Sequence, residues 1–196
     1  MPLFWKHTTS DQPAGKEETV QGSVRKLDTV ARMMGLPKDV EAKLDEAARK
    51  AKESLVYDNM RQLHRAVVKY SVYHHGNYPV VIDNSMNTYL LNMNTPGLDD
   101  QYIPGKGIVN PYTGKPEWPT VGNVMDVSVA QNSDPPAMHP GQIQYNAING
   151  TSSAILGGGI DGKALPEQYG RFKTEVLSDP PVMEYSPNST DTKSSQ

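Results

Sequence analysis

Residues 60–79 read Met-Arg-Gln-Leu-His-Arg-Ala-Val-Val-Lys-Tyr-Ser-Val-Tyr-His-His-Gly-Asn-Tyr-Pro, and this stretch decides the fold. Its apolar residues recur at helical spacing. Gly76 can take the left-handed conformation that closes a helix, and Pro79 cannot continue one. His74 and His75 stand where the negative end of the helix dipole favours positive charge. The stretch therefore predicts a helix that ends near His75 and leads into a sheet.

The helical spacing extends upstream to Pro37. Between residues 37 and 75 the apolar positions follow one another in steps of mostly three and four: Val40, Leu44, Ala47, Ala51, Leu55, Met60, Leu63, Val67 and Tyr70. One amphipathic helix of this length spans roughly 58 Å at about 1.5 Å per residue. A head of about 100 residues has a radius of gyration of only about 13 Å. We therefore expect the first half of the helix to project.

The apolar stripe changes in size along the helix. Its first half carries the small Ala47 and Ala51, and its second half carries the larger Leu63, Val67 and Tyr70. We expect the large residues to be buried against the head. Small residues with paired charges suit either solvent or close contact with another helix, and the sequence leaves these two alternatives open.

The pattern after Pro79 is typical of strands. Residues 142–148 alternate between apolar and polar side chains, and Asn149 with Gly150 is the pair typical of a two-residue hairpin turn. Asp161 and Gly162 mark a second turn. These signals predict antiparallel pairing.

The remaining segments of the head give weaker signals. Residues 80–82 and 122–129 predict short strands, whereas 88–91 fits either a strand or a helical turn. Residues 92–119 contain five prolines and predict a long irregular excursion over the surface.

These patterns predict an α+β fold in four parts, which we expect to be as follows. Residues 1–36 form an arm with a short amphipathic helix at 23–34, and residues 37–78 form the long spine helix. Residues 79–178 form an antiparallel β head with long loops. Residues 179–196 form a flexible tail, because Pro180-Pro181 and a Ser/Thr-rich end follow the last apolar run.

Several motifs occur in a characteristic order over roughly residues 55–166. A pattern of Leu, Ala, Tyr, Gly, Tyr and Pro closes the helix at Leu63, Ala66, Tyr70, Gly76, Tyr78 and Pro79. Three motifs follow it: Asn-Pro-Tyr-Thr-Gly at 110–114, Gly-Gln-Ile-Gln-Tyr at 141–145, which ends at Tyr145, and Asp-Gly-Lys-Ala-Leu at 161–165, which begins with Asp161 and Gly162. In the order of these motifs the chain resembles the type IV pilins and the pseudopilins of type II secretion.

The resemblance implies a pilin-like fold and a structural role. The protein would be a subunit or accessory component of a pilus-like filament or secretion pseudopilus. Its partners would be copies of itself, other pilin-like subunits, and the secretion or pilus machinery. The alternative is a soluble pilin-like module that captures a protein or a glycan without forming filaments.

The chain departs from the family at its N-terminal side. Pilins carry a leader, a cleavage site and an apolar helix half, whereas residues 37–54 here are charged. We therefore expect either a protein made without an anchor or a sequence that is not the whole natural protein. The family implies the cell envelope or the extracellular space, and the missing signal peptide leaves the cytoplasm open.

Composition argues against nucleic-acid and membrane functions. Residues 1–78 hold 13 basic and 10 acidic residues, and residues 79–196 hold 6 and 12. The basic residues of the spine alternate with acids at i,i+4 spacing, which is typical of an exposed helix and not of a phosphate-binding stripe. No stretch approaches the ~20 apolar residues of a membrane span.

The sequence also lacks the usual catalytic and metal-binding patterns. There is no cysteine, and none of the five histidines forms an i,i+4 pair. Related pseudopilins bind calcium through an acidic loop, but Asp99, Asp100, Asp161 and Asp179 do not form a calcium-loop pattern. We expect no enzymatic activity, no cofactor and no metal; calcium stays possible without support from spacing.

Overall fold

The computed structural model describes residues 37–90 and 101–179. The predicted helix at 23–34 and the predicted tail beyond residue 179 lie outside the described residues.

The spine is one continuous helix, α2 (Lys38–Tyr73), of 36 residues. Pro37 precedes its first turn, and Asp39 and Glu41 place negative charge at its positive end. The helix ends two residues before the expected position, because His75 is itself left-handed with a φ of 57°, as Gly76 is with a φ of 86°. The Gly76 N–H then donates to the Ser71 carbonyl at 2.8 Å, which closes the helix.

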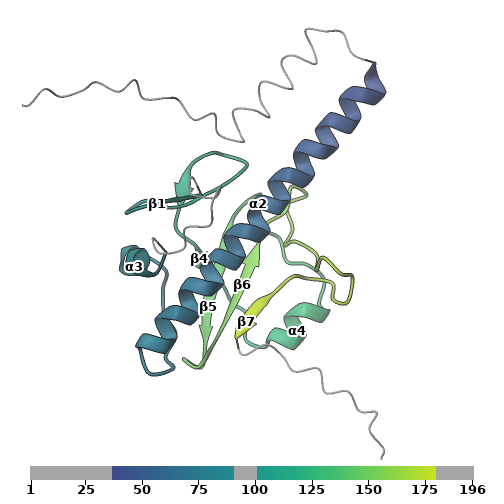
Figure 1. The fold of residues 1–196 in the computed structure, drawn as a ribbon. Coiled ribbons are helices and arrows are strands. Elements are labelled where there is room, and N and C mark those ends of the chain that lie inside the picture. Colours follow the sequence, from purple (N-terminus) through teal and green to yellow (C-terminus); the bar gives the residue numbers. More distant parts are fainter. Residues whose placement is uncertain (1–36, 91–100, 180–196) are drawn as a thin grey trace, which may run out of the picture.

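The remaining elements form two small sheets with short helices around them. In chain order they are η1 (Asn84–Met86), α3 (Asn87–Leu90), β1 (Tyr102–Ile103), β2 (Gly107–Val109), β3 (Pro116–Glu117), β4 (Thr120–Val121), α4 (Val127–Asn132), β5 (Ile143–Ile148), β6 (Ser152–Gly157) and β7 (Leu177–Asp179). One sheet has the order β1-β2-β3 and is antiparallel; the other has the order β4-β5-β6-β7. The fold is therefore α+β, with a long helix against small sheets (Figure 1).

The predicted hairpin is confirmed. β5 pairs with β6 in antiparallel register from Ile143 opposite Gly157 to Ile148 opposite Ser152. Asn149 and Gly150 connect the strands with φ values of 52° and 70°. With Thr151 they make a three-residue loop, in which the Thr151 N–H donates to the Ile148 carbonyl at 3.3 Å.

The expected strand at 122–129 is wrong. Only the preceding Thr120 and Val121 form a strand, and α4 begins at Val127. The physical reason is Asp126, whose Oδ1 accepts a hydrogen bond from the Val129 N–H at 3.1 Å and caps the helix. Met125 and Val129 are consequently exposed.

Three further expectations need correction. Residues 80–82 form no strand. Residues 101–119 are not irregular throughout, because β1, β2 and β3 lie within them. β4 and β5 pair in parallel, since the chain passes through α4 before it returns, whereas the other strand pairs among the described residues are antiparallel. At 88–91, where the sequence fits either a strand or a helical turn, residues 87–90 form α3.

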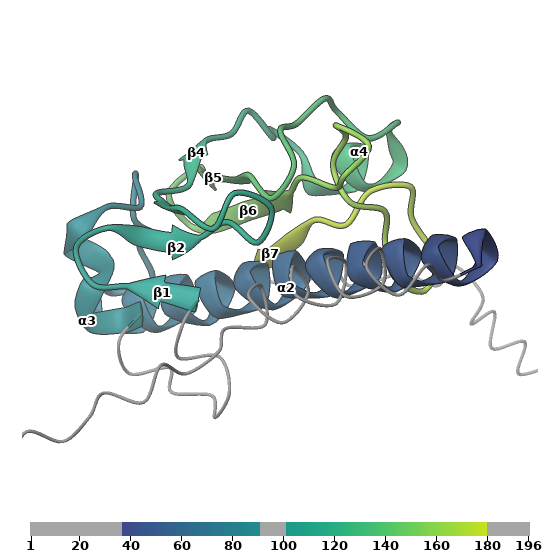
Figure 2. The same cartoon turned by 90° about the horizontal axis from the view of Figure 1, so that it is seen from above.

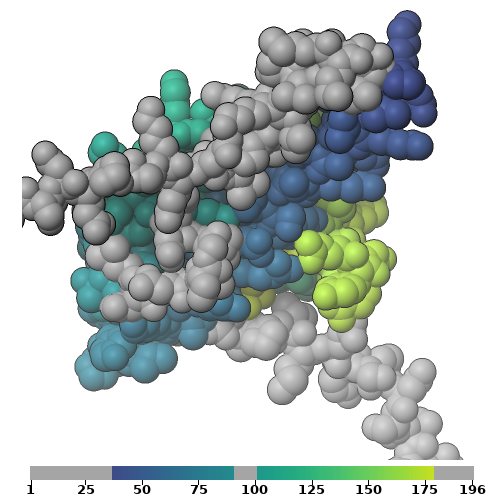
Figure 3. All heavy atoms as spheres, turned by 45° about the horizontal axis from the view of Figure 1, so that its top comes forward, coloured from purple at the N-terminus to yellow at the C-terminus, as the bar shows by residue number. Residues whose placement is uncertain are grey.

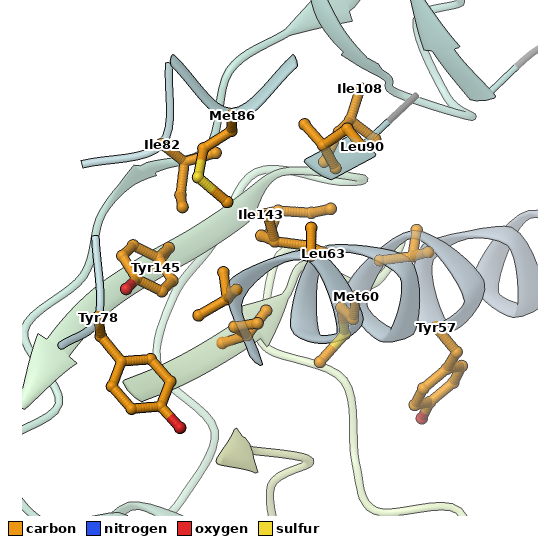
Figure 4. Packing of buried hydrophobic residues seen from close by; sticks show 14 of the residues in the cluster. Tyr57, Met60, Leu63, Tyr78, Ile82, Met86, Leu90, Ile108, Ile143 and Tyr145 are labelled. Atoms are coloured by element: carbon orange, nitrogen blue, oxygen red, sulfur yellow. The ribbon is translucent and has the colours of Figure 1, made fainter. Parts of the chain in front are cut away.

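The core has two parts, one on each face of the four-stranded sheet. On one face α2 packs through Val56, Met60 and Leu63, and η1 and α3 close this cluster with Met86 and Leu90 (Figure 4). On the other face a smaller cluster forms beneath α4 from Val124, Met138, Ile148, Ala154, Leu156, Ala164 and Val176. Figure 2 shows α2 and α4 on opposite sides of this sheet.

Candidate assembly surface

The N-terminal half of α2 extends beyond the head. The first fully buried residue of the helix is Val56, and every buried position of α2 lies between it and Ser71. Before Val56 the apolar side chains are half-buried or, like Ala47, exposed; the half-buried ones are Val40, Leu44, Ala48, Ala51 and Leu55. Figures 1 and 3 show these first turns at the edge of the molecule. We call residues 38–51 the projecting half.

The projecting half and the two residues after it carry equal numbers of opposite charges. Residues 38–53 hold five basic and five acidic side chains. Lys50 Nζ lies 2.9 Å from Glu46 Oε1, and the hydrogen bond and charge of Lys50 lower the pKa of Glu46. Exposed pairs of this kind add little stability. They do make the surface electrically neutral, which suits another neutral helix better than a polyanion.

Leu63 and Val67 are buried as expected, but Tyr70 is not. Leu63 and Val67 are fully inaccessible to solvent, whereas Tyr70 is only half-buried at the rim of the core. Its ring stacks on His74 at 3.8 Å between centroids and meets Tyr89 edge-on at 5.3 Å. The reason for the difference is that Tyr70 lies on the turn of α2 that faces α3, where its ring packs against Tyr89.

Three predicted residues from distant parts of the chain meet at the end of α2. The Tyr145 hydroxyl donates to the Pro79 carbonyl at 2.6 Å, and the Tyr78 N–H donates to the Gly150 carbonyl at 3.0 Å. Burial, and then the neighbouring Tyr78, raise the pKa of the Tyr145 hydroxyl. Together with Gly76 these residues join the helix to the hairpin. Their contacts are internal.

Asp161 and Gly162 lie elsewhere, in a turn beside Met138. The Asp161 carboxylate accepts from the Lys163 N–H at 3.1 Å, and Gly162 is left-handed with a φ of 77°. Met138 N–H donates to the Gly162 carbonyl at 2.9 Å. The turn is therefore structural.

Among residues 37–90 and 101–179 there is no group of three or more His, Asp or Glu side chains that could hold a metal. Asp99 and Asp100 lie outside the described residues, as does the side chain of Asp179. The absence of a calcium requirement stays a prediction. None of the helices in the described ranges is both long enough and apolar enough to cross a bilayer.

The head contains a cleft that the sequence does not predict. The cleft has a volume of about 490 Å³ and lies between the segment 110–120 and the start of β5. The only local signal was Asn-Pro-Tyr-Thr-Gly at 110–114, whose asparagine is 4% exposed. The second wall comes from residues 139–143, which no local pattern connects to the first.

The chain matches no protein-family model, no curated protein and no solved structure.

Proposed function

We propose that this protein is a structural subunit or accessory component of a pilus-like filament or secretion pseudopilus and acts by protein–protein contact. The observation that carries the proposal is the projecting half of α2, none of whose residues is buried. The motif order that resembles the pilins, and a spine helix packed on a hairpin, support the same conclusion. The partners are copies of this chain, other pilin-like subunits and the machinery that assembles them; catalysis and cofactors have no part in it.

The helical stripe is the contact surface in this proposal. A helix of about 14 residues is marginal in water when nothing packs on it. Ala47 and Ala51 are one turn apart on the same face, so a second helix can approach closely there. Half-buried Val40 and Leu44 extend the stripe toward the N-terminal end. Packing two such stripes together stabilises both helices.

The test compares alanine-to-glutamate changes on opposite faces of the projecting half. Ala47 lies on the stripe, and Ala42 lies about half a turn away from it at 100° per residue; both are exposed. The wild-type chain and Ala42→Glu should form oligomers as concentration rises, by multi-angle light scattering and negative-stain microscopy. Ala47→Glu and Ala51→Glu should stay monomeric with an unchanged thermal midpoint for the head.

Two outcomes contradict the proposal in different ways. Oligomers of unchanged mass in Ala47→Glu would remove the stripe as the contact. A wild-type chain that stays monomeric at all concentrations would favour the alternative, a binding module that forms no filaments.

A further inference from the structure

The cleft beside β3 and β4 has rigid walls. Asn110 organises the first wall: its Oδ1 accepts from the N–H groups of Tyr112 at 2.9 Å and Thr113 at 3.3 Å. Its Nδ2 donates to Glu117 Oε1 at 2.6 Å and to the Pro140 carbonyl at 3.0 Å. The last bond fastens the first wall to the second. All the hydrogen-bonding groups of this buried amide are thus used.

Gly141 permits this arrangement. Its φ is 75°, and a Cβ atom at this position would overlap the side-chain amide of Asn110. Only glycine therefore allows the two walls to approach so closely.

The second wall presents polar groups that are already held in place. Gln142 Oε1 accepts from the His139 N–H at 3.2 Å, and Gln142 Nε2 donates to Thr120 Oγ1 at 3.0 Å. Fixing these groups before a ligand arrives reduces the ordering cost of binding. The Gln142 amide keeps one N–H for a ligand, because an amide nitrogen carries two.

Two aromatic side chains complete the lining. Trp118 is held edge-on against Tyr102 at 6.1 Å between centroids. The ring of Tyr112 lies 5.5 Å from Lys52 Nζ of α2, and its hydroxyl is buried with no hydrogen-bond partner in the described chain. The ring of Tyr112, and not its enclosed hydroxyl, is therefore what this residue presents to a ligand.

The charges of the lining restrict the ligand. No lysine or arginine lines the cleft, so a phosphate or carboxylate would find no strong partner. The one carboxylate, Glu117, is already bonded to Asn110 through Oε1. Hydroxyl, amide and imidazole groups beside aromatic faces suit a ligand that has neutral hydroxyls on one edge and C–H groups on its face.

We propose that this cleft binds a short neutral saccharide. The C–H face of a pyranose packs on the rings of Tyr112 and Trp118, and its hydroxyls exchange hydrogen bonds with Thr113, Thr120, His139 and Gln142. The volume of about 490 Å³ falls within the range of about 300–1,000 Å³ typical of small-molecule sites. The site forms within one chain, so it does not depend on assembly.

The experiment uses the full chain carrying Trp5→Phe. The sequence contains two tryptophans, so this change leaves Trp118 as the only one. Cellotriose, maltotriose, lactose and triacetylchitotriose serve as neutral probes at about 10 mM, a concentration that detects a Kd near 1 mM. We expect saturation transfer to at least one of them in ligand-observed NMR and a shift of Trp118 fluorescence. 3′-Sialyllactose, the anionic counterpart of lactose, and a tetraproline peptide serve as comparisons.

Matched variants test the site itself. Gln142→Ala and His139→Ala should weaken binding at least tenfold with unchanged thermal midpoints. Gln144→Ala, a change in β5 outside the lining, should bind as before. Three results overturn the proposal: no transfer to any neutral probe, equal binding by Gln142→Ala, or preference for the sialylated sugar. Binding of tetraproline alone would overturn it in favour of a peptide site.

Discussion

Asn110 and Tyr145 each connect parts of the chain that lie far apart in the sequence. Asn110 reaches Pro140 across 30 residues, and Tyr145 reaches Pro79 across 66. Both side chains are buried and hydrogen-bonded. Their positions are readable in the sequence only as members of short motifs; which carbonyl each one meets depends on the tertiary fold.

Glu175 gives the protein a specific dependence on pH. Burial, and then the negative charge of Glu167, raise the pKa of its carboxyl above the ordinary value. A raised folded-state pKa means that the stabilising contribution is fully present below the unfolded pKa and is lost as pH rises through the folded pKa. Ionised Glu175 therefore opposes folding at neutral pH.

We predict that Glu175→Gln raises the thermal midpoint at pH 7 and that the gain shrinks toward zero below about pH 4, where an ordinary glutamate is protonated. Calorimetry at the two pH values measures this. Glu46→Gln is the control, and it should change the thermal midpoint at pH 7 in the opposite direction, because Lys50 lowers the pKa of Glu46. A gain of equal size at both pH values would show that the charge of Glu175 is not the cause.

At the scale of elements, α2 packs directly on the backbone of Gly157 in β6. A Cβ atom on this glycine would lie 2.5 Å from Met60 Sδ and 2.7 Å from Val56 Cγ1. Both side chains are fully buried, so neither can move into solvent. The glycine therefore sets the distance between helix and sheet.

Gly157→Ala should destabilise the fold by about 1–3 kcal/mol through overpacking. Val56→Ala alone should destabilise it by leaving a cavity. The double variant should be more stable than the sum of the two effects predicts, because the new methyl group occupies part of the vacated space. Urea denaturation of the four proteins measures the coupling, and strict additivity would mean that α2 does not pack on Gly157.

The elements that could be predicted from sequence are those with strong local signals. α2 has a sustained helical period, and the hairpin has its Asn149-Gly150 turn. The strand prediction at 122–129 was wrong because the alternating apolar residues Met125, Val127 and Val129 fit two structures equally well. One is a strand, and the other is an exposed loop followed by a capped helix. β1 to β4 are two or three residues long, too short for a periodic signal, and the β4–β5 pairing follows from tertiary structure alone.

The candidate surfaces differ in the same way. The projecting half could be predicted from local sequence. Its apolar positions carry the small Ala47 and Ala51, whereas the later positions of the same helix carry larger apolar residues. The cleft could not, because its walls come from segments joined only through Asn110 and Pro140. The half-burial of Tyr70 likewise depends on where α3 lies, which the helical period does not contain.

For the whole molecule, α2 combines two roles. Its C-terminal half is a core layer between η1, α3 and the four-stranded sheet, and its N-terminal half lies outside that core. The cleft meets α2 at Tyr112, whose ring lies 5.5 Å from Lys52 Nζ, just beyond the projecting half. Ala47→Glu, which lies more than one helical turn before this contact, therefore tests assembly separately from saccharide binding.

The hydrogen bond from Tyr145 to Pro79 has a consequence for the order of folding. It closes a loop of about 66 residues, for which the length-dependent entropy alone costs about 4 kcal/mol. The hairpin turn at Asn149 and Gly150 closes only a few residues. We expect the hairpin to form before the rate-limiting step and the joint with the helix to form after it.

Tyr145→Phe should therefore lower stability by about 1–2 kcal/mol almost entirely through faster unfolding, with refolding unchanged. Gly150→Ala, which strains a turn residue with a φ of 70°, should instead slow refolding. Stopped-flow chevron measurements separate the two, and slower refolding of Tyr145→Phe would reverse the order. On this account the hairpin governs how fast the protein folds, and one hydroxyl at the end of the helix governs how long it stays folded.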